Sequence, residues 1–211
     1  MESARNNILA RLKAAQDKRG EIEERIPNFT SSIYHPINQP LDLEFKNNLE
    51  LIGGEVILCR SKVEVAEKIL RICAEKLQNR IFCCNPELSE LLTGTIEINS
   101  EESDFLNLNI GLTSCEYLVA HLGSVLISSA QVSGRRLNVF PETHIVVAHQ
   151  SQLTDYLDLA MEKLQDKYKN KLPSLISNIT GPSRTADIEK TLVMGMHGPK
   201  SLIVLISEET I

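Results

Sequence analysis

Short apolar runs alternate with longer amphipathic segments between residues 41 and 92, and this alternation constrains the fold more than any other feature. The runs Glu55–Cys59 and Arg80–Cys84 have the length and apolar content of buried strands. Between them, Val63–Leu77 places its apolar side chains on one helical face, and Leu41–Ile52 shows the same period. Gly53-Gly54 comes directly after Leu41–Ile52, where glycine supplies the left-handed residue of a C-cap. We therefore predict an α/β fold with a mostly parallel sheet.

Further strands and helices are expected in the rest of the chain. The hydroxyl side chains at positions 113 and 114 suit the start of a short helix over Cys115–Val119. Gly123–Ala130 and His144–Ala148 are predicted strands, and because no helix is expected between them we predict that they pair antiparallel. The other expected elements are a strand within Leu106–Leu112, a helix over Gln152–Tyr168, and strands over Ser174–Ile179 and Ser201–Ile206.

The first 40 residues differ in character from the rest of the chain. Ser3–Arg19 is predicted to be an amphipathic helix, and Glu21–Pro40 is a polar, proline-containing connector. We expect two parts, an N-terminal helix and connector over residues 1–40 and a single α/β domain over residues 41–211. We expect the helix to pack outside the main core or against a partner; the alternative is that it simply covers that core.

Composition narrows the class of protein. The chain has 211 residues and a net charge of −6, which argues against a dedicated nucleic-acid binder. No apolar run approaches the roughly 20 residues of a membrane span, and the N-terminus lacks the apolar centre of a signal peptide, so we expect a cytoplasmic protein. The five cysteines form no C-x-x-C pair, which predicts no disulfide framework, no zinc or iron–sulfur site and no redox cofactor in this chain.

The segment Ile176–Lys200 contains the strongest candidate for a binding site. A predicted strand ends at the Gly181-Pro182 turn, the polar loop Ser183-Arg184-Thr185 comes next, and a short helix is expected to begin near Ala186. Asp187 suits the positive end of that helix, whose free N–H groups could hold an anion. Capping alone explains the hydroxyls, but it does not require the guanidinium of Arg184, which suits a carboxylate or phosphate.

Other residues are weaker candidates for the same kind of site. His197 is expected in the last turn of the short helix, where it either bonds terminal carbonyls or contacts the ligand. Gly123 and Ser124 precede a predicted strand, and the glycine either allows backbone to approach a ligand or forms a plain turn. The candidate ligand-binding residues are therefore Gly181, Ser183, Arg184, Thr185, Asp187, Gly123, Ser124 and His197; no catalytic residue and no metal ligand is assigned.

The run TGPSRTADIEKTLVMGMHGPKSLIVLI, over Thr180–Ile206, resembles the C-terminal signature of the lactate utilization protein C family, which shares a domain with the related B proteins. Weaker similarity extends through GSVLISSAQVSGRRLNVFPETHIVVA. The resemblance implies a three-layer α/β sandwich like those of the ribose-phosphate isomerase, glucosamine-phosphate deaminase and coenzyme A transferase superfamily. It also implies a role in oxidising L-lactate to pyruvate beside partner proteins that carry iron–sulfur clusters.

One departure from the family pattern falls at His121. Many members have an Ala-Glu-Thr-Gly-Thr-like stretch where this chain has Ala120-His121-Leu122-Gly123-Ser124, so an acid is missing. Three functions remain open at this point. The chain is a subunit of a lactate-oxidising system that is not catalytic alone, a stand-alone binder, isomerase or transferase of a phosphorylated or acyl-carrier metabolite, or a non-catalytic interaction module.

Overall fold

The computed structural model describes residues 2–17, 34–100, 109–169, 171–186 and 192–211. Contacts between residues divide the chain into two units, Met1–Pro36 and Ile37–Ile211. The first unit contains helix α1 (Glu2–Asp17), whose Ile8 and Leu12 are exposed. A helix was predicted at this place; most of the predicted connector lies outside the described residues, and the domain boundary at residue 40 stays a prediction.

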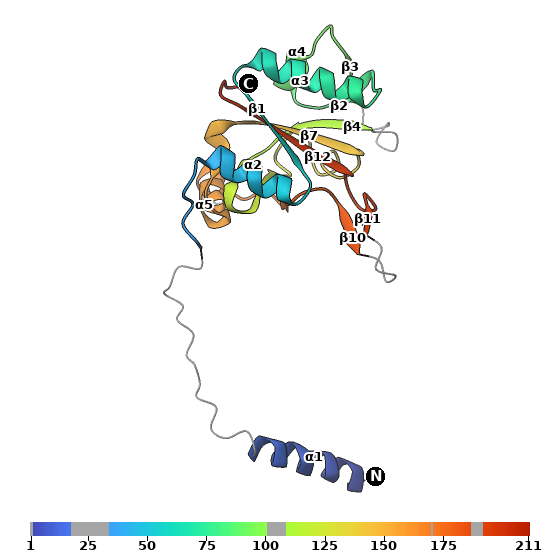
Figure 1. Ribbon diagram of the computed structural model, residues 1–211, viewed down its shortest axis with the longest axis vertical. Coiled ribbons are helices and arrows are strands. Elements are labelled where there is room, and N and C mark those ends of the chain that lie inside the picture. The colour runs from blue at the N-terminus through green and yellow to red at the C-terminus, as the bar shows by residue number, and fades with distance from the viewer. Residues whose placement is uncertain (1, 18–33, 101–108, 170, 187–191) are drawn as a thin grey trace. The chain divides into compact units, whose positions relative to one another are not determined.

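A six-stranded parallel sheet forms the centre of the second unit (Figure 1). Every pair of neighbouring strands in it is parallel, and β12 and β7 are paired over their full length. Parallel sheets are buried on both faces, which explains why β7 and β12 are continuous apolar runs. The α/β prediction is confirmed. The strands are, in spatial order, β1 (Glu55–Cys59), β12 (Ser201–Ser207), β7 (Thr143–His149), β4 (Ile110–Ser114), β2 (Arg80–Cys83) and β3 (Glu97–Asn99).

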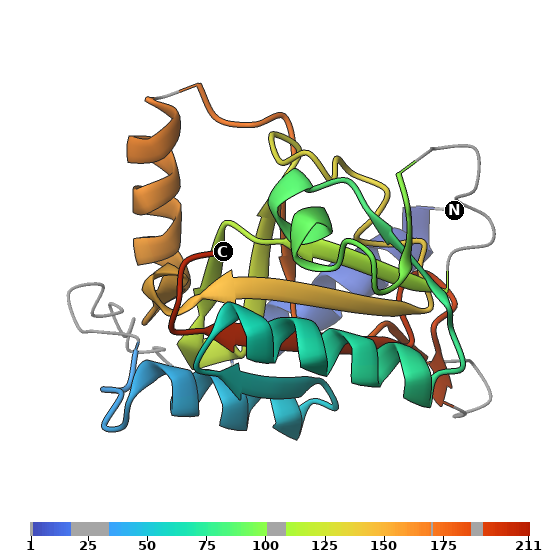
Figure 2. The same ribbon diagram turned by 90° about the horizontal axis from the view of Figure 1, so that it is seen from above.

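The two faces of this sheet pack against different partners. On one face, Ile145 and Val147 of β7 join a core with helices α3 (Lys62–Glu75) and α4 (Pro86–Leu91). On the other face, Val146 and Ala148 join a core with helix α2 (Leu41–Leu51) and a second sheet. Figure 1 shows α3 and α2 on opposite faces of the parallel sheet, and in Figure 2, seen from above, α3 lies in front of its strands.

The second sheet has four strands and its own helix. Strand β6 lies between β5 and β9 and is antiparallel to both. Helix α5 (Leu157–Tyr168) covers the far face of this sheet through Ala160 and Leu164. The strands are, in spatial order, β8 (Leu153–Thr154), β5 (Tyr117–Val119), β6 (Ser124–Ser128) and β9 (Ile176–Ile179); the short 3₁₀ helices are η2 (Ala120–Leu122) and η3 (Gln150–Gln152).

The prediction that residues 123–130 pair antiparallel with residues 144–148 is wrong. Strand β6 belongs to the four-stranded sheet, and β7 lies between β12 and β4 in the parallel sheet. The segment between them carries the chain from one sheet to the other, and its Leu137 is buried in contact with Phe82 of β2. Closeness in sequence therefore did not indicate pairing here.

The helix expected over Cys115–Val119 is also wrong, because β5 occupies residues 117–119. The side chains that looked like a capping group make contacts with distant residues instead. The hydroxyl of Thr113 lies 2.8 Å from Nε2 of His144, and Glu116 is bonded to α5 and β6. Polar residues at the ends of strands can thus have the same sequence pattern as the N-cap and first turn of a helix.

The helix expected to begin near Ala186 is wrong as well. Strands β10 (Arg184–Ala186) and β11 (Leu192–Met194) form an antiparallel pair, with Thr185 opposite Val193. The β-branched side chains of both residues suit a strand better than a helix. Asp187 lies outside the described residues. The N–H groups of a helix start therefore cannot form the predicted anion site. The polar residues of the loop remain candidates for binding a ligand.

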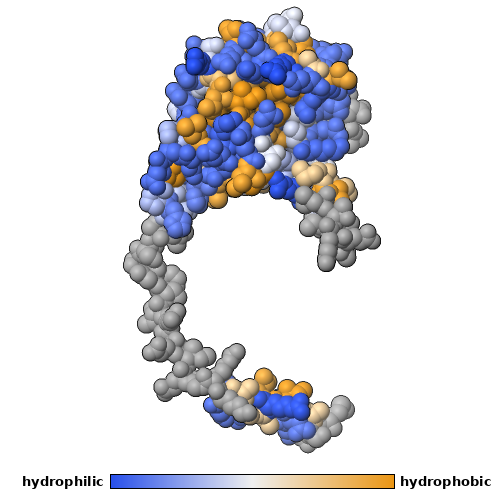
Figure 3. All heavy atoms as spheres, in the orientation of Figure 1, coloured by the Kyte–Doolittle hydropathy of each residue, from blue (hydrophilic) through white to orange (hydrophobic). Residues whose placement is uncertain are grey.

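Apolar side chains gather on the surface over the edge strand β1, between α2 and α3 (Figure 3). Leu58 of β1 is 40% exposed, and Leu51 at the end of α2 is 85% exposed. No helix in the described ranges has the length and apolar character that crossing a membrane requires.

Candidate functional site

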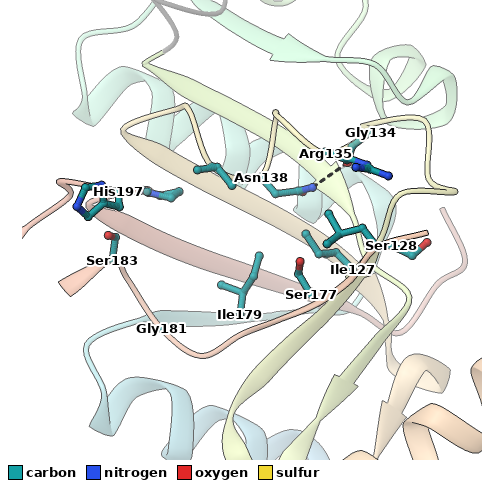
Figure 4. Close-up of a pocket in the computed structure, with 14 residues that line it drawn as sticks. Ile127, Ser128, Gly134, Arg135, Asn138, Ser177, Ile179, Gly181, Ser183 and His197 are labelled. Atoms are coloured by element: carbon teal, nitrogen blue, oxygen red, sulfur yellow. Dashed lines mark hydrogen bonds between the residues drawn. The ribbon is translucent and has the colours of Figure 1, made fainter. Parts of the chain in front are cut away.

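The loop Ser183-Arg184-Thr185 borders a cavity of about 230 Å³. The cavity is lined by residues just before β10 and just after β11, and because these two strands form a hairpin it is called the hairpin cavity. Gly181, Ser183 and His197 lie at one end of it (Figure 4). The backbone N–H of Ser183 donates to the carbonyl of Pro199 at 2.9 Å, and its carbonyl accepts from the N–H of Gly195 at 3.0 Å. These bonds hold the residues before β10 beside those after β11, so three predicted residues share one wall.

Arg135 lies at the other end of the hairpin cavity (Figure 4). Its guanidinium donates to the hydroxyl of Ser174 at 2.6 Å and is otherwise exposed, which leaves N–H groups for an anion at the rim. Ile127 and Ile179 form part of the wall between the two ends. The cavity therefore combines an apolar middle with hydrogen-bond donors at both ends.

Asn138 also lines this cavity, and its side chain contains a buried acceptor. The residue is 2% exposed, and its side-chain amide donates to the carbonyl of Gly134 at 3.1 Å. Its Oδ1 is buried and has no hydrogen-bond partner among the described residues. A buried acceptor without a partner costs free energy, which a ligand hydroxyl or N–H could recover. Asn138 thus favours a ligand that carries a donor as well as an anionic group.

Two predicted residues of the loop lie elsewhere. Arg184 and Thr185 are in β10, and Arg184 is exposed. The guanidinium of Arg184 lies beside the turn between α2 and β1, where a β-carbon on Gly53 would be 2.8 Å from its Nη2. Neither residue lines the hairpin cavity.

Gly123 and Ser124 are buried away from the cavity. A β-carbon on Gly123 would lie 2.3 Å from the backbone nitrogen of Leu49, so the close approach expected of this glycine is to helix α2. The hydroxyls of Ser124 and Thr180 are 2.7 Å apart and connect β6 to the residue after β9. His121, at the departure from the family pattern, accepts at its backbone carbonyl from the side-chain amide of Asn48.

Several polar residues were missed from the sequence. Arg135 and Asn138 lie in a segment that looked like a simple turn, and the only signal was the pair of adjacent arginines. The sequence predicts Glu116 at the start of a helix, whereas its side chain is fully buried and paired with Lys167. A buried charge needs such a partner, but sequence spacing does not reveal one that is 51 residues away.

No group of three or more His, Cys, Asp or Glu residues is arranged to hold a metal ion within the part of the chain that the structure describes.

Burial raises the pKa of the Cys59 and Cys73 thiols to about 11. Both thiols are therefore protonated at neutral pH.

The family of this chain follows from its similarity to known proteins. The pattern of the LUD domain matches residues 43–207, which include both sheets and the hairpin. The chain belongs to the LUD domain family. This match is consistent with the resemblance seen in the sequence and covers the second unit almost completely.

Relatives of this LUD domain protein include lactate utilization protein C of Bacillus subtilis (strain 168), which is 36% identical over 103 residues. That match covers 47% of this chain and 43% of the relative, so the chain matches less than half of the relative's length. The uncharacterized protein YkgG of Escherichia coli (strain K12) is 33% identical over 184 residues, covering 74% of this chain and 77% of that protein.

A solved structure shows the same fold. The crystal structure of a DUF162 family protein from Deinococcus radiodurans superposes with a TM-score of 0.60 at 18% sequence identity. The superposition covers 82% of this chain and 99% of that chain. At this identity the similarity concerns the fold alone.

Proposed function

We propose that this LUD domain protein is a subunit of an L-lactate-oxidising system and that its hairpin cavity holds a small anionic ligand. Membership of a family whose relatives include lactate utilization proteins C supports the first part. The observation that supports the second part is the cavity itself, which brings Ser183 and His197 together with Arg135 and the unpartnered oxygen of Asn138.

The polar groups of the hairpin cavity suit a 2-hydroxy acid. A carboxylate accepts from the hydroxyl of Ser183 and an imidazole N–H of His197, or from Arg135 at the opposite rim. If the side chain of Asn138 turns toward the cavity when the ligand binds, a ligand hydroxyl donates to its Oδ1, which otherwise stays unsatisfied. L-Lactate has both groups, and pyruvate lacks the hydroxyl donor. The proposal therefore ranks lactate above pyruvate as a ligand of this cavity.

The redox chemistry is assigned to partner proteins that carry iron–sulfur clusters. Oxidising lactate to pyruvate releases two electrons and two protons, and the clusters of the partners would accept the electrons. In this proposal the chain supplies ligand binding and an assembly surface, acts in the cytoplasm and has no catalytic activity alone. The proposal also includes a distant relationship to the ribose-phosphate isomerase and coenzyme A transferase superfamily, supported by the parallel sheet with helices on one face and a second sheet on the other.

Reconstitution tests the assignment to a lactate-oxidising system. The iron–sulfur lactate utilization proteins would be assayed for L-lactate-dependent dye reduction with and without the purified full chain. We expect the rate to depend on the chain and to fall when His197→Ala replaces it, whereas Met196→Ala, one residue away on the same exposed segment, retains the rate. If the partners alone reduce the dye at the same rate, the proposal is wrong.

A further inference from the structure

A second cavity, of about 550 Å³, lies at the carboxyl edge of the parallel sheet and is here called the edge cavity. Asn85 follows β2, Ser114 ends β4 and His149 ends β7, and all three line it. Because the strands are parallel, their carboxyl ends meet at one edge, which is where open α/β sheets bind ligands. Among the residues that the structure describes, none lines both the edge cavity and the hairpin cavity.

A buried carboxylate lies behind the wall of the edge cavity. The side chain of Glu116 is fully buried, and its Oε2 accepts from Nζ of Lys167 at 2.7 Å. Its Oε1 accepts from the hydroxyls of Ser128 at 2.6 Å and Tyr168 at 2.7 Å. Burial by itself raises the pKa of this carboxyl, but the bonds from Lys167, Ser128 and Tyr168 outweigh burial and hold the pKa below its ordinary value. Glu116 is therefore ionised at neutral pH.

Glu116 fixes the position of two residues that line the edge cavity, Lys167 and Tyr168. The side chain of Lys167 is 53% exposed, and its ammonium has three protons. One proton is donated to Glu116, so two remain for a group in the cavity. An ammonium held in place before a ligand arrives loses less entropy on binding than a free lysine does.

Ser114 supplies a second donor to the edge cavity. Its hydroxyl oxygen accepts from the side-chain amides of Gln131 at 3.3 Å and Asn85 at 3.5 Å. A hydroxyl has two acceptor sites and one proton, so these two bonds use both acceptor sites and leave the proton to donate. Ser114 and Lys167 thus both need an acceptor, and both line the same cavity.

We propose that the edge cavity is a second ligand site, which binds a small organic oxyanion, a carboxylate or a phosphate ester, through Lys167 and Ser114. Glu116 acts there as a positioning residue, because it touches Lys167 and Tyr168 and does not itself line the cavity. Gln152, which also lines the cavity, is held in place on both sides of its side chain: its amide donates to the carbonyls of Cys115 and Glu116, and its carbonyl oxygen accepts from the backbone N–H of His149 at 2.7 Å.

Calorimetric titration of the full chain tests the edge cavity. The probes are inorganic phosphate, glycerol 3-phosphate and L-lactate, which separate a phosphate ester from a carboxylate as the source of the oxyanion; L-lactate is titrated into chains that carry His197→Ala, so that the proposed lactate site does not contribute. We expect Lys167→Met and Ser114→Ala each to weaken binding of the preferred probe about tenfold, as expected when one hydrogen bond to a charged group is lost. Lys163→Met is the matched control, because Lys163 lies on the same helix, is exposed and packs over the ring of Tyr117 instead.

Lys167→Met leaves the buried Glu116 without its cation and could destabilise the fold, so Ser114→Ala, which keeps that pair, carries the test independently. Lys167→Arg restores a cation and is expected to restore binding. His197→Ala, in the hairpin cavity, is expected to leave binding at the edge cavity unchanged, which separates this proposal from the proposed lactate site. The proposal is overturned if none of the three probes binds, or if Ser114→Ala binds the preferred probe as tightly as the unaltered chain does.

Discussion

The hydroxyl of Ser128 donates to Oε1 of Glu116 at 2.6 Å, and this bond connects the wall of one cavity to the residue behind the wall of the other. Ser128 lines the hairpin cavity, and Glu116 holds Lys167 and Tyr168 at the edge cavity. The same bond joins β6 of the four-stranded sheet to the chain between β4 and β5. Glu116 is thus a point of contact between both sheets, helix α5 and both candidate sites.

Replacing Glu116 with glutamine is expected to lower the free energy of unfolding by about 2 kcal/mol. The change removes charge-assisted bonds, each worth about 1.5–3 kcal/mol, but the half-exposed Lys167 regains water and glutamine retains an acceptor, which limits the loss. Urea unfolding at pH 7 measures the difference.

The control for this prediction is Glu162→Gln on the exposed side of α5, where a change within about 0.5 kcal/mol is expected. If both substitutions have the same small effect, the Glu116 cluster does not stabilise the fold.

The acid stability of the protein is expected to depend on His144. This residue is fully buried between β12 and β4, and burial lowers its pKa from 6.5 to about 4. Between these two values the unfolded chain binds a proton that the folded chain does not, so the free energy of unfolding rises with pH through this window and levels off above it. The rise amounts to about 3 kcal/mol at 1.36 kcal/mol for each pH unit.

His144→Phe is expected to remove most of this pH dependence, and denaturant unfolding at a series of pH values measures it. The exposed His35 provides the control, since His35→Phe should keep the full rise. Glu116 contributes in a separate window, because its lowered pKa makes its stabilisation disappear only as pH falls below its ordinary value of 4.5. An unchanged slope in His144→Phe between pH 4 and 6.5 would contradict the prediction.

Local periodicity predicted the elements that bury one face against a nearby partner. Strand β1 has the predicted bounds, and α3 and β2 differ from their predicted bounds by no more than two residues. In these segments the helical or extended period, the capping serine at position 61 and the end of the apolar run all indicate the same structure.

The elements that were missed depend on distant residues. Whether β6 pairs with β7 or with β9 depends on how Leu137 and the segment around it pack, which no short window contains. At the candidate site, the loop around Ser183 was found because its polar residues are contiguous, but Arg135 and Asn138 reach the same cavity from a segment more than 40 residues earlier. A pattern of spacing cannot show that two loops meet.

Arg135 is expected to matter more than Arg184 for binding in the hairpin cavity. Arg135 lines the cavity, whereas Arg184 lies in β10 beside Gly53. Arg135→Ala should weaken binding of L-lactate about tenfold, the loss expected for one charge-assisted hydrogen bond, and Arg184→Ala should change it less than twofold. Ligand-observed NMR titration measures both.

Arg136→Ala serves as the control for the change in charge, because Arg136 is adjacent to Arg135 and does not line the cavity. The opposite ranking, with Arg184→Ala as the weaker binder, would move the site to the hairpin itself.

Substitutions at Gly123 and Gly134 separate two effects on stability: the close approach of Gly123 to helix α2, and the positive φ angle that both glycines adopt. Both glycines have φ of +60°, so alanine is strained by a similar amount at either position, about 1 kcal/mol. A β-carbon on Gly134 would meet nothing within 4 Å, whereas one on Gly123 would lie 2.3 Å from the backbone nitrogen of Leu49 in α2. Gly134→Ala is therefore expected to lower the free energy of unfolding by about 1 kcal/mol. Gly123→Ala should cost at least about 3 kcal/mol, because α2 must move away from the core that it shares with both sheets. Equal losses in thermal or urea unfolding would show that the contact between η2 and α2 adds nothing beyond the conformation of the glycine.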